Sequence, residues 1–433
     1  MKITRIIMAC CCLLSVSCFN AAGLKSVRLE DYGPIDNADA VFQTFTRAFA
    51  DISGKRLVLP GVRLEIDRDL VLRDAYNFEL TAMPGSVLEC RRLLILDSHK
   101  FSVSGLSVFG KAGRFASFDI MGNCSGFEVA NCVFDSEKGP DGLNMFYGMH
   151  IACDGSAPNP SYENSPRSFR IHDNTVCNSR YDGILVHAHC SDFVVENNMV
   201  TNPQCIGIEV EGRLGDNTHT TVHRCRNGAI RSNTISGCGD WGILLMWSDG
   251  ISVTDNVSTG TAGTFLSIGC TRLKVRRNHL EGTKKGFEIS QEFYAVDKGI
   301  NEHIVVRNNE IACVARADGR GAVDIRHSRD VVFRGNTVTL AGRPSSGAVN
   351  VSSSVDVRVT DNTFTGPGEL PPFAVICDNV KDPETGIEVP LLDLANVRIL
   401  RNKLPEAFRE SPSRVPVVDK AVTVRNTFRK DNN

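Results

Sequence analysis

The chain has 433 residues, of which 42% are hydrophobic, and this is enough to bury a large core. Its 48 Lys and Arg residues nearly balance its 50 Asp and Glu residues, so the formal net charge is −2. With no basic run standing out, these values argue against nucleic acid as the main partner.

The first segment, residues 1–22, is typical of an export signal. Lys2 and Arg5 supply the positive charge, and the apolar run 6–16 that follows is too short to span a bilayer. Cleavage is expected at the end of this segment, or else Cys18 is the lipid-anchored residue of a loose lipobox. We expect a periplasmic, secreted or outer-membrane lipoprotein location, with no later transmembrane segment.

Residues 23–66 predict an N-terminal cap. A strand is expected over 27–32, and residues 37–52 have the apolar spacing of an amphipathic helix. Asp36 or Asn37 is expected to cap this helix, and a first strand follows at 57–61. An open end of a stacked sheet exposes apolar core and unpaired strand edges, so a covering helix is physically expected there.

Residues 67–433 contain an internal repeat. The pattern apolar-x-apolar-x-x-Asn-x-apolar recurs, mostly at spacings of 22 to 27 residues. The recurring asparagines are Asn131, Asn174, Asn198, Asn233, Asn256, Asn278, Asn309, Asn336, Asn362, Asn402 and Asn426. A unit of this length cannot bury its own apolar side, and stacking the units does so. We expect the asparagines to stack at one turn, where they tolerate left-handed backbone and exchange side-chain hydrogen bonds.

A second motif alternates with the first and consists of a glycine followed by a strand of alternating apolar residues. Examples are 183–187, 207–211 and 286–290. Alternation indicates one buried and one exposed face. The twelve cysteines after the signal are interpreted mainly as small buried hydrophobes, although a Cys190–Cys205 disulfide stays open.

These motifs carry a family resemblance. The segment VRLEDYG, the helix and then GKRLVLPG resemble the N-terminus of the pectate-lyase-like superfamily, and the Asn repeats resemble its right-handed β-helix members. The resemblance implies an all-β, single-stranded, right-handed parallel β-helix, a solenoid, with an N-terminal capping helix. This superfamily includes lyases, hydrolases, epimerases and phage tailspikes. None of the best-known catalytic signatures of these enzymes is present as such in the sequence.

The alternating strands predict which residues share the exposed face. Aligned after the glycine, one outward column contains His150, Leu185, Glu209, Leu244, Ser267, Glu288, Asp324 and Asn350. His187, Glu211 and Arg326 lie two residues further along their strands. One group of this face is expected to be catalytic: Glu209 and Glu211 as an acid/base pair, assisted by His187.

Other residues near this group are expected to bind substrate. They are His150, His189, Arg213, Trp241, Trp247, Glu288, Asp324 and Arg326. The two tryptophans suit stacking on sugar rings if they are exposed, and core filling otherwise. Glu288, Asp324 and Arg326 lie about three strands from Glu209, so they suit a second subsite.

The sequence therefore favours a carbohydrate-active enzyme that cleaves the glycosidic bonds of a polysaccharide. A glycoside hydrolase is the first choice. The alternatives are a polysaccharide lyase that uses His187, Lys284 or Lys285 as a base, an epimerase, and a non-catalytic glycan-binding β-helix. No cofactor or metal is predicted, except calcium in the case of a lyase. The expected partner is a polysaccharide or oligosaccharide, and not nucleic acid.

Overall fold

The fold is known from a computed structural model. The structure describes residues 23–110, 116–136, 146–153, 161–214, 222–290, 300–314, 321–341, 347–366, 373–378, 392–409 and 421–429. The predicted export segment 1–22, with Cys18, lies outside the described residues. Within the described part, no helix has the length and apolarity needed to cross a membrane.

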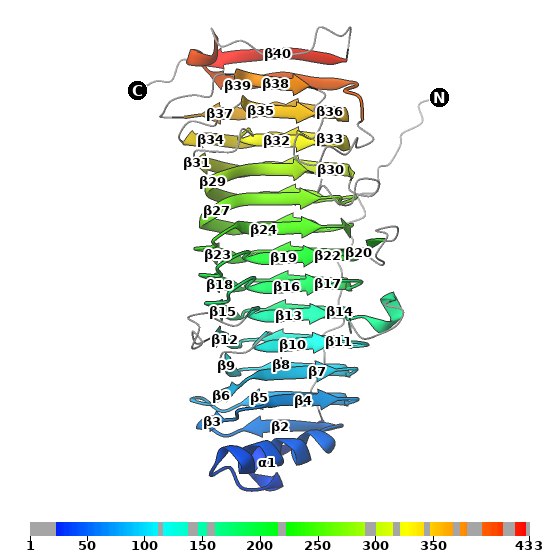
Figure 1. Cartoon of the computed structure of the whole chain (residues 1–433), viewed down its shortest axis with the longest axis vertical. Helices are drawn as coiled ribbons and strands as arrows, with labels where there is room; N and C mark the ends of the chain where they lie inside the picture. The colour runs from blue at the N-terminus through cyan, green and yellow to red at the C-terminus, as the bar shows by residue number, and fades with distance from the viewer. Residues whose placement is uncertain are drawn as a thin grey trace, which may run out of the picture.

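Short parallel strands stack into one long column (Figure 1). The column has three ladders of hydrogen-bonded strands, here called sheets A, B and C. Every turn of the chain, here called a rung, adds one strand to each sheet. Consecutive strands of one turn therefore belong to different sheets, whereas hydrogen-bonded neighbours are a whole repeat apart. This arrangement confirms the predicted right-handed parallel β-helix.

Sheet A consists of β1 (Lys25–Arg28), β2 (Lys55–Leu59), β5 (Tyr76–Ala82), β8 (His99–Ser104), β11 (Ser125–Ala130), β14 (Arg167–His172), β17 (Ser191–Glu196), β22 (Cys225–Arg231), β26 (Ser252–Thr254), β28 (Lys274–Arg276), β30 (Asn301–Arg307), β33 (Ser328–Arg334), β36 (Val355–Thr360), β39 (Val397–Pro405) and β40 (Val422–Arg429). The short β25 (Ser248–Asp249) also pairs with β22.

Sheet B consists of β3 (Arg63–Glu65), β6 (Val87–Cys90), β9 (Ser107–Gly110), β12 (Val133–Ser136), β15 (Thr175–Cys177), β18 (Met199–Thr201), β23 (Thr234–Ser236), the first parts of β27 (Val257–Ile268) and β29 (His279–Ser290), β31 (Glu310–Val314), β34 (Thr337–Ala341) and β37 (Thr363–Thr365). The end of β39 continues this ladder.

Sheet C consists of β4 (Asp69–Arg73), β7 (Arg92–Leu96), β10 (Phe118–Met121), β13 (Met149–Ala152), β16 (Ile184–His187), β19 (Ile208–Glu211), β24 (Trp241–Met246), the second parts of β27 and β29, β32 (Val323–Arg326), β35 (Gly347–Ser352) and β38 (Phe373–Asp378). A hairpin of β20 (Arg213–Leu214) and β21 (Val222–His223) and the 3-10 turn η2 (Tyr162–Asn164) project from the column (Figure 1). The 3-10 turn η3 (Glu406–Arg409) packs against β39 and β40 through the buried Phe408.

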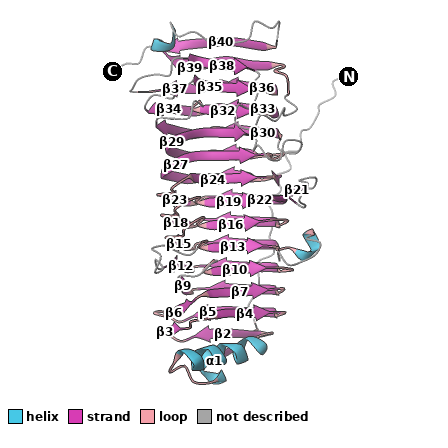
Figure 2. Cartoon of the chain, in the orientation of Figure 1, coloured by secondary structure: helices cyan, strands magenta, loops and turns pink. Residues whose placement is uncertain are grey.

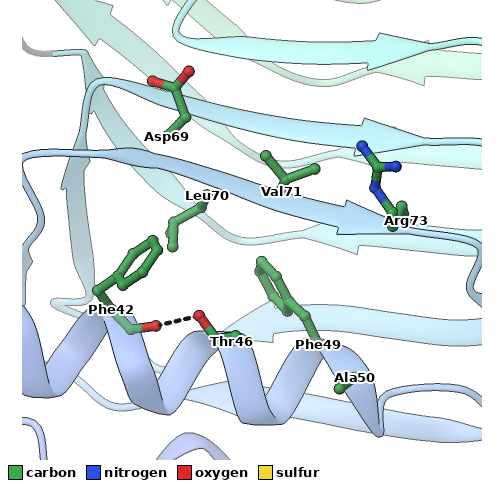
Figure 3. A pocket seen from close by; sticks show the side chains of 8 residues that line it. All are labelled: Phe42, Thr46, Phe49, Ala50, Asp69, Leu70, Val71 and Arg73. Atoms are coloured by element: carbon green, nitrogen blue, oxygen red, sulfur yellow. Dashed lines mark hydrogen bonds between the residues drawn. The ribbon is translucent and has the colours of Figure 1, made fainter.

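The N-terminal end is closed by α1 (Ala38–Ala50), which follows the 3-10 turn η1 (Leu29–Tyr32). The side chain of Asn37 accepts a hydrogen bond from the N–H of Ala40 at 2.9 Å, so the predicted cap is confirmed at Asn37. Figure 2 shows this helix lying across the end of the stacked strands. A hollow of about 320 Å³ lies between α1 and β4, beside Phe42 and Phe49 (Figure 3), and it is many rungs away from the site described below.

The recurring asparagines form a buried ladder between sheets A and B. From Asn174 to Asn426, the side-chain nitrogen of each donates to the side-chain oxygen of the next at 2.9 to 3.0 Å. Each side-chain oxygen also accepts the backbone N–H of the preceding asparagine. The predicted rung-to-rung bonding is thus confirmed.

Two details of the asparagine prediction are wrong. Left-handed backbone occurs at the residue before each ladder asparagine, such as Asn308 with φ 56°, because the chain turns there. In the earliest copy this turn residue is Asn131, with φ 55°, and Cys132 takes the ladder position. The N–H of Cys132 donates to Oδ1 of Asn174 at 3.0 Å.

The core between the sheets is apolar and partly aromatic. Phe78, Phe101, Phe127, Phe169 and Phe193 stack on successive rungs with ring centroids 4.8 to 5.3 Å apart. All twelve described cysteines carry free thiols and most are buried, as expected for small core residues. Cys190 and Cys205, whose pairing the sequence left open, are both among the free thiols.

The ladder predicts different effects for two adjacent asparagines. Asn309→Ala removes the acceptor of the Asn278 side chain and backbone, leaving buried donors unsatisfied. We expect a loss of roughly 2–4 kcal/mol in the free energy of unfolding, measured by urea denaturation. Asn308→Gly is the matched control, because Asn308 is exposed and glycine suits its left-handed backbone. Equal losses in the two variants would contradict a stabilising role of the ladder.

Candidate functional site

The outer face of sheet C carries a column of mostly buried side chains, six of them polar and three of them leucines. Pairing from rung to rung gives, in order, Asp119, His150, Leu185, Glu209, Leu244, Leu266, Glu288, Asp324 and Asn350. These residues alternate with core residues and point away from the core. Even so, Asp119 and Glu288 have no exposed surface and Glu209 is 6% exposed. Carboxyl groups buried outside the core are unusual and are typical of functional sites.

The predicted column is wrong at one rung. Leu266 pairs with Leu244 and Glu288, whereas Ser267 points inward and donates its hydroxyl to Oδ1 of Asn301 at 2.8 Å. The reason is that Gly263 of β27 pairs with Trp241, so that Thr264 lies opposite Gly242 and the glycine of this repeat comes one residue early. Aligning the repeats on their glycines therefore misplaces β27 by one residue, and a shift of one residue exchanges the two faces.

Glu209 meets a second buried carboxyl group, that of Asp182, which lies directly before the glycine that leads into β16. The two side chains share a hydrogen bond, and Asp182 also accepts the N–H of Ile206 at 3.3 Å. Burial raises the pKa of Asp182 to about 6, although these hydrogen bonds lower it. The pair is therefore expected to hold one proton near neutral pH.

Glu211 lies two residues after Glu209 on the same face, with Cα atoms about 6.6 Å apart along the strand. Its Oε2 lies 3.8 Å from Nε2 of His187, which is directly opposite on β16. Both side chains keep more than a quarter of their surface exposed. Glu211 and His187 therefore form the solvent-facing side of the carboxyl cluster.

His150 lies one rung further, and an aspartate orients it. Its Nδ1 lies 2.9 Å from Oδ1 of Asp119, whose other oxygen accepts from the guanidinium of Arg92. The His150 and His187 rings are 5.9 Å apart. Nε2 of His150 is buried and has no hydrogen-bond partner among the described residues. This nitrogen is therefore an unsatisfied polar atom directly beside the carboxyl cluster.

Aromatic residues border the cluster. The Tyr147 ring stacks on His150 with centroids 5.2 Å apart, and Phe146 stacks on Tyr181 at 5.0 Å. Burial raises the pKa of Tyr147, and the nearby negative charges of Asp182, Glu211 and Glu209 add to this effect. Tyr181 is 41% exposed, so its ring offers an apolar surface of the kind on which sugar rings stack.

Both tryptophans lie outside the core, but neither is exposed. Trp241 and Trp247 are each 4% exposed and pack with Ile206, Leu244, Met246, Leu266 and Ile268 in a separate apolar cluster on the outer face of sheet C. The ammonium of Lys285 lies 4.9 Å from the Trp241 ring and pairs with Asp240. The expectation that these rings provide exposed stacking surfaces is not met. Their cluster instead covers the rungs beside Glu209.

The second predicted group lies beyond this apolar cluster. Glu288 and Asp324 are opposite each other on β29 and β32. Arg326 donates to both oxygens of Asp324, at 2.7 and 2.9 Å. Three rungs of about 4.8 Å place this group about 14 Å from Glu209, too far to share one reacting bond.

His189 and Arg213 lie at the turn that follows sheet C. His189 contacts His223, and Tyr162 of η2 stacks on its ring at 4.8 Å. Burial, with the nearby His223, lowers the pKa of His189 to about 4. Arg213 lies opposite His223 in the β20–β21 hairpin. The structure thus brings Glu209, Glu211, His187 and His150 together, and it places His189 and Arg213 with the projecting loops.

Sequence reasoning missed Asp119, Tyr147, Asp182 and Asp240. One signal could have found two of them, because Tyr147 and Asp182 each stand directly before the glycine of a strand motif. Asp119 precedes the glycine-bearing repeats, so only the pairing of β10 with β13 places it beside His150.

Comparison with known proteins supports the fold. Residues 210–367 match the family model described as "Periplasmic copper-binding protein (NosD)". The N-terminal fragment of bacteriophage Phi29 gene product 12 superposes with a TM-score of 0.64 at 16% identity, covering 94% of this chain and 72% of that one. Because the identities are low, such likeness shows the fold alone.

Two enzymes have the same architecture. The A-module of the Azotobacter vinelandii mannuronan C-5 epimerase AlgE4 has a TM-score of 0.57 at 12% identity, covering 82% of this chain and 98% of the module. DFA-IIIase from Arthrobacter chlorophenolicus A6, without its lid and in complex with GF2, has a TM-score of 0.50 at 13% identity, covering 94% and 99%. A search of curated protein sequences finds no significant match. The chain has the right-handed parallel β-helix fold.

The name of the matching family includes copper binding, which would require a group of metal-ligating side chains. Among the side chains that the structure describes, no group of three or more His, Cys, Asp or Glu residues is arranged to hold a metal ion. The described residues therefore do not fit a copper centre, and no step of the chemistry is assigned to one.

The shared proton predicts a pH-dependent effect of Asp182→Asn. The folded pKa of Asp182 lies above its ordinary value, so folding stability is lost as the pH rises through about 6. The asparagine variant lacks this titration. The urea midpoint of the variant minus that of the native chain should therefore increase between pH 4.5 and pH 8. Asp74→Asn, at an exposed aspartate, is the control and should show a constant difference. A constant difference for Asp182→Asn as well would rule out the raised pKa.

Proposed function

We propose that the chain is an exported carbohydrate-active enzyme that hydrolyses glycosidic bonds of a polysaccharide on the outer face of sheet C. The observation that carries this proposal is the buried Asp182–Glu209 pair beside the more exposed Glu211. Glycoside hydrolysis needs one carboxyl group that keeps its proton and one that is ionised. This cluster has both environments within two rungs.

The protonated pair supplies the acid. A carboxyl with a pKa near 6 can donate its proton to the glycosidic oxygen at neutral or slightly acidic pH. Glu211, which faces solvent beside His187, is assigned the second role. It activates a water molecule, or it stabilises the positive charge that develops on the sugar.

Neighbouring residues bind the chain of sugars. Tyr147 and Tyr181 offer aromatic surface at one side of the carboxyls. About 14 Å away along the column, beside the buried Glu288, the partly exposed Arg326 is held by the buried Asp324 and provides a polar group. An extended polysaccharide lying parallel to the column axis would meet both groups. Two proteins of similar fold are a mannuronan epimerase and DFA-IIIase, which supports a carbohydrate substrate. The periplasmic location in the matching family description supports export.

A second candidate is removal of a proton from carbon, as in a polysaccharide lyase or epimerase. The Asp119–His150 pair favours it, because the partnerless Nε2 of His150 suits a general base. The surrounding carboxyl groups Asp182, Glu209 and Glu211 disfavour it, since they would repel the uronate that such a reaction needs. We therefore place hydrolysis first.

Activity measurements on a polysaccharide panel test the assignment. Glu209→Gln and Glu211→Gln are each expected to lower kcat/KM by at least about a hundredfold, the usual scale for loss of an acid or base. The native kcat/KM should fall as the pH rises through about 6. Asp182→Asn should change this decrease of kcat/KM with pH. Glu65→Gln, at an exposed glutamate of β3, is the control and should retain full activity.

The products separate the alternatives. New reducing ends without ultraviolet-absorbing unsaturated uronate are expected for hydrolysis. Unsaturated products that depend on His150 would replace the hydrolase by a lyase, and altered uronate composition without shortening would replace it by an epimerase. If the chain retains glycan without forming any product, and Glu209→Gln retains glycan equally well, the protein is a non-catalytic glycan-binding protein.

A further inference from the structure

The outer face of sheet A, away from the candidate site, carries a column of arginines. Arg276 on β28 lies directly opposite Arg307 on β30, which in turn lies opposite Arg334 on β33. Adjacent strands of a sheet are about 4.8 Å apart. Like charges in directly opposite positions repel each other, so this column opposes folding unless it has another use.

Two of these arginines have no carboxylate partner among the described residues. Arg276 and Arg307 are half-buried, and the Nε atom of each is buried without a hydrogen-bond acceptor. Arg334 contacts Asp361 at 3.0 Å. Buried charged donors are normally satisfied, and an unsatisfied one is costly. Two such donors on neighbouring rungs therefore mark a place for an external anion.

Arginines elsewhere on sheet A are neutralised. Glu196 lies between Arg170 and Arg231 and accepts a hydrogen bond from each guanidinium at 2.5 Å. Arg277, next to Arg276 in the chain, donates two hydrogen bonds of 2.7 Å to Asp255. Paired arginines thus occur on β14, on β22 and in the turn after β28, and the lack of carboxylate partners among the described residues at Arg276 and Arg307 is a local property.

A groove lies beside the unpaired arginines on the same strands. It measures about 780 Å³, and its lining includes Lys274 and Val305, which stand two residues before Arg276 and Arg307 on the same face. Arg272, which pairs with Asp249, and His303, which pairs with Asp330, also line the groove, and Gly228 and Ser252 complete part of its floor. The groove gives an elongated ligand room to lie against the charged column.

We propose that this groove and the Arg276–Arg307–Arg334 column bind an anionic polysaccharide, with carboxylate or sulfate groups on successive sugars. Arginine binds such planar or tetrahedral anions through paired N–H groups. The rung spacing of about 4.8 Å is comparable to the length of one sugar residue in an extended chain. Successive anionic sugars would therefore meet successive arginines.

A glycan suits the groove better than a nucleic acid. Single-stranded nucleic acids depend on aromatic side chains on which their bases stack. Phe, Tyr and Trp are not among the described residues that line the groove. The acidic cluster of sheet C lies on a different face, so this binding site is separate from the proposed reaction.

Binding of polygalacturonate to the purified chain, measured by calorimetry at low salt, tests the proposal. The double variant Arg276→Gln with Arg307→Gln should bind at least about tenfold more weakly, with a smaller salt dependence. Arg231→Gln with Arg277→Gln removes the same net charge from paired arginines of the same face, and it should change affinity much less. The first double variant should also keep or raise its urea midpoint, because a repulsion is removed.

Several results would overturn the proposal. Equal weakening in both double variants would mean that only net charge matters, and undetectable binding by the native chain would exclude the site. Tighter binding of a single-stranded oligonucleotide or of anionic phospholipid vesicles would assign the face to another partner. Glu209→Gln should bind polygalacturonate normally through this face, which keeps the outcome independent of the proposed hydrolysis.

Discussion

The structure depends on the register between successive turns of the chain, and the buried asparagine ladder fixes that register. Each ladder asparagine gives and receives side-chain hydrogen bonds in a setting without water, so a slip of one residue would leave several donors unsatisfied. Because the side-chain period of a strand is two, the same slip would also turn core residues outward. A single polar interaction, repeated at each rung from Asn174 to Asn426, thereby decides which side chains share a face.

This fixed register assembles the candidate site from residues far apart in the chain. Asp119, His150 and Glu209 come from separate repeats, yet they lie on neighbouring rungs of sheet C. The apolar cluster that contains Trp241 and Trp247 lies directly beside Glu209 on the same face. Apolar neighbours favour the neutral form of a carboxyl, which agrees with the raised pKa of Asp182. The rungs thus supply position, and the outer apolar cluster supplies low polarity.

The faces of the column have different electrostatic character. Sheet C carries buried acids outside the core, whereas Arg276 and Arg307 of sheet A have no counter-charge within the part of the chain that the structure describes. A net charge of −2 for the whole chain conceals this division, since the charges are separated by face and not by position in the sequence. A solenoid permits such a division because every strand contributes one short segment to each face.

The sequence by itself determined the architecture, the capping helix and most of the outward column. Periodic Asn and Gly residues mark every turn, and amphipathic spacing marks the helix, so these features are local. Only the tertiary structure decided that Asn131 is a turn residue, that Leu266 replaces Ser267, and that Asp182 meets Glu209. The reason is that the glycine of β27 comes one residue earlier than in the other repeats, and that Asp182 lies before its strand, outside the alternating pattern that marks the exposed face. Their neighbours are set by three-dimensional stacking, which no local pattern encodes.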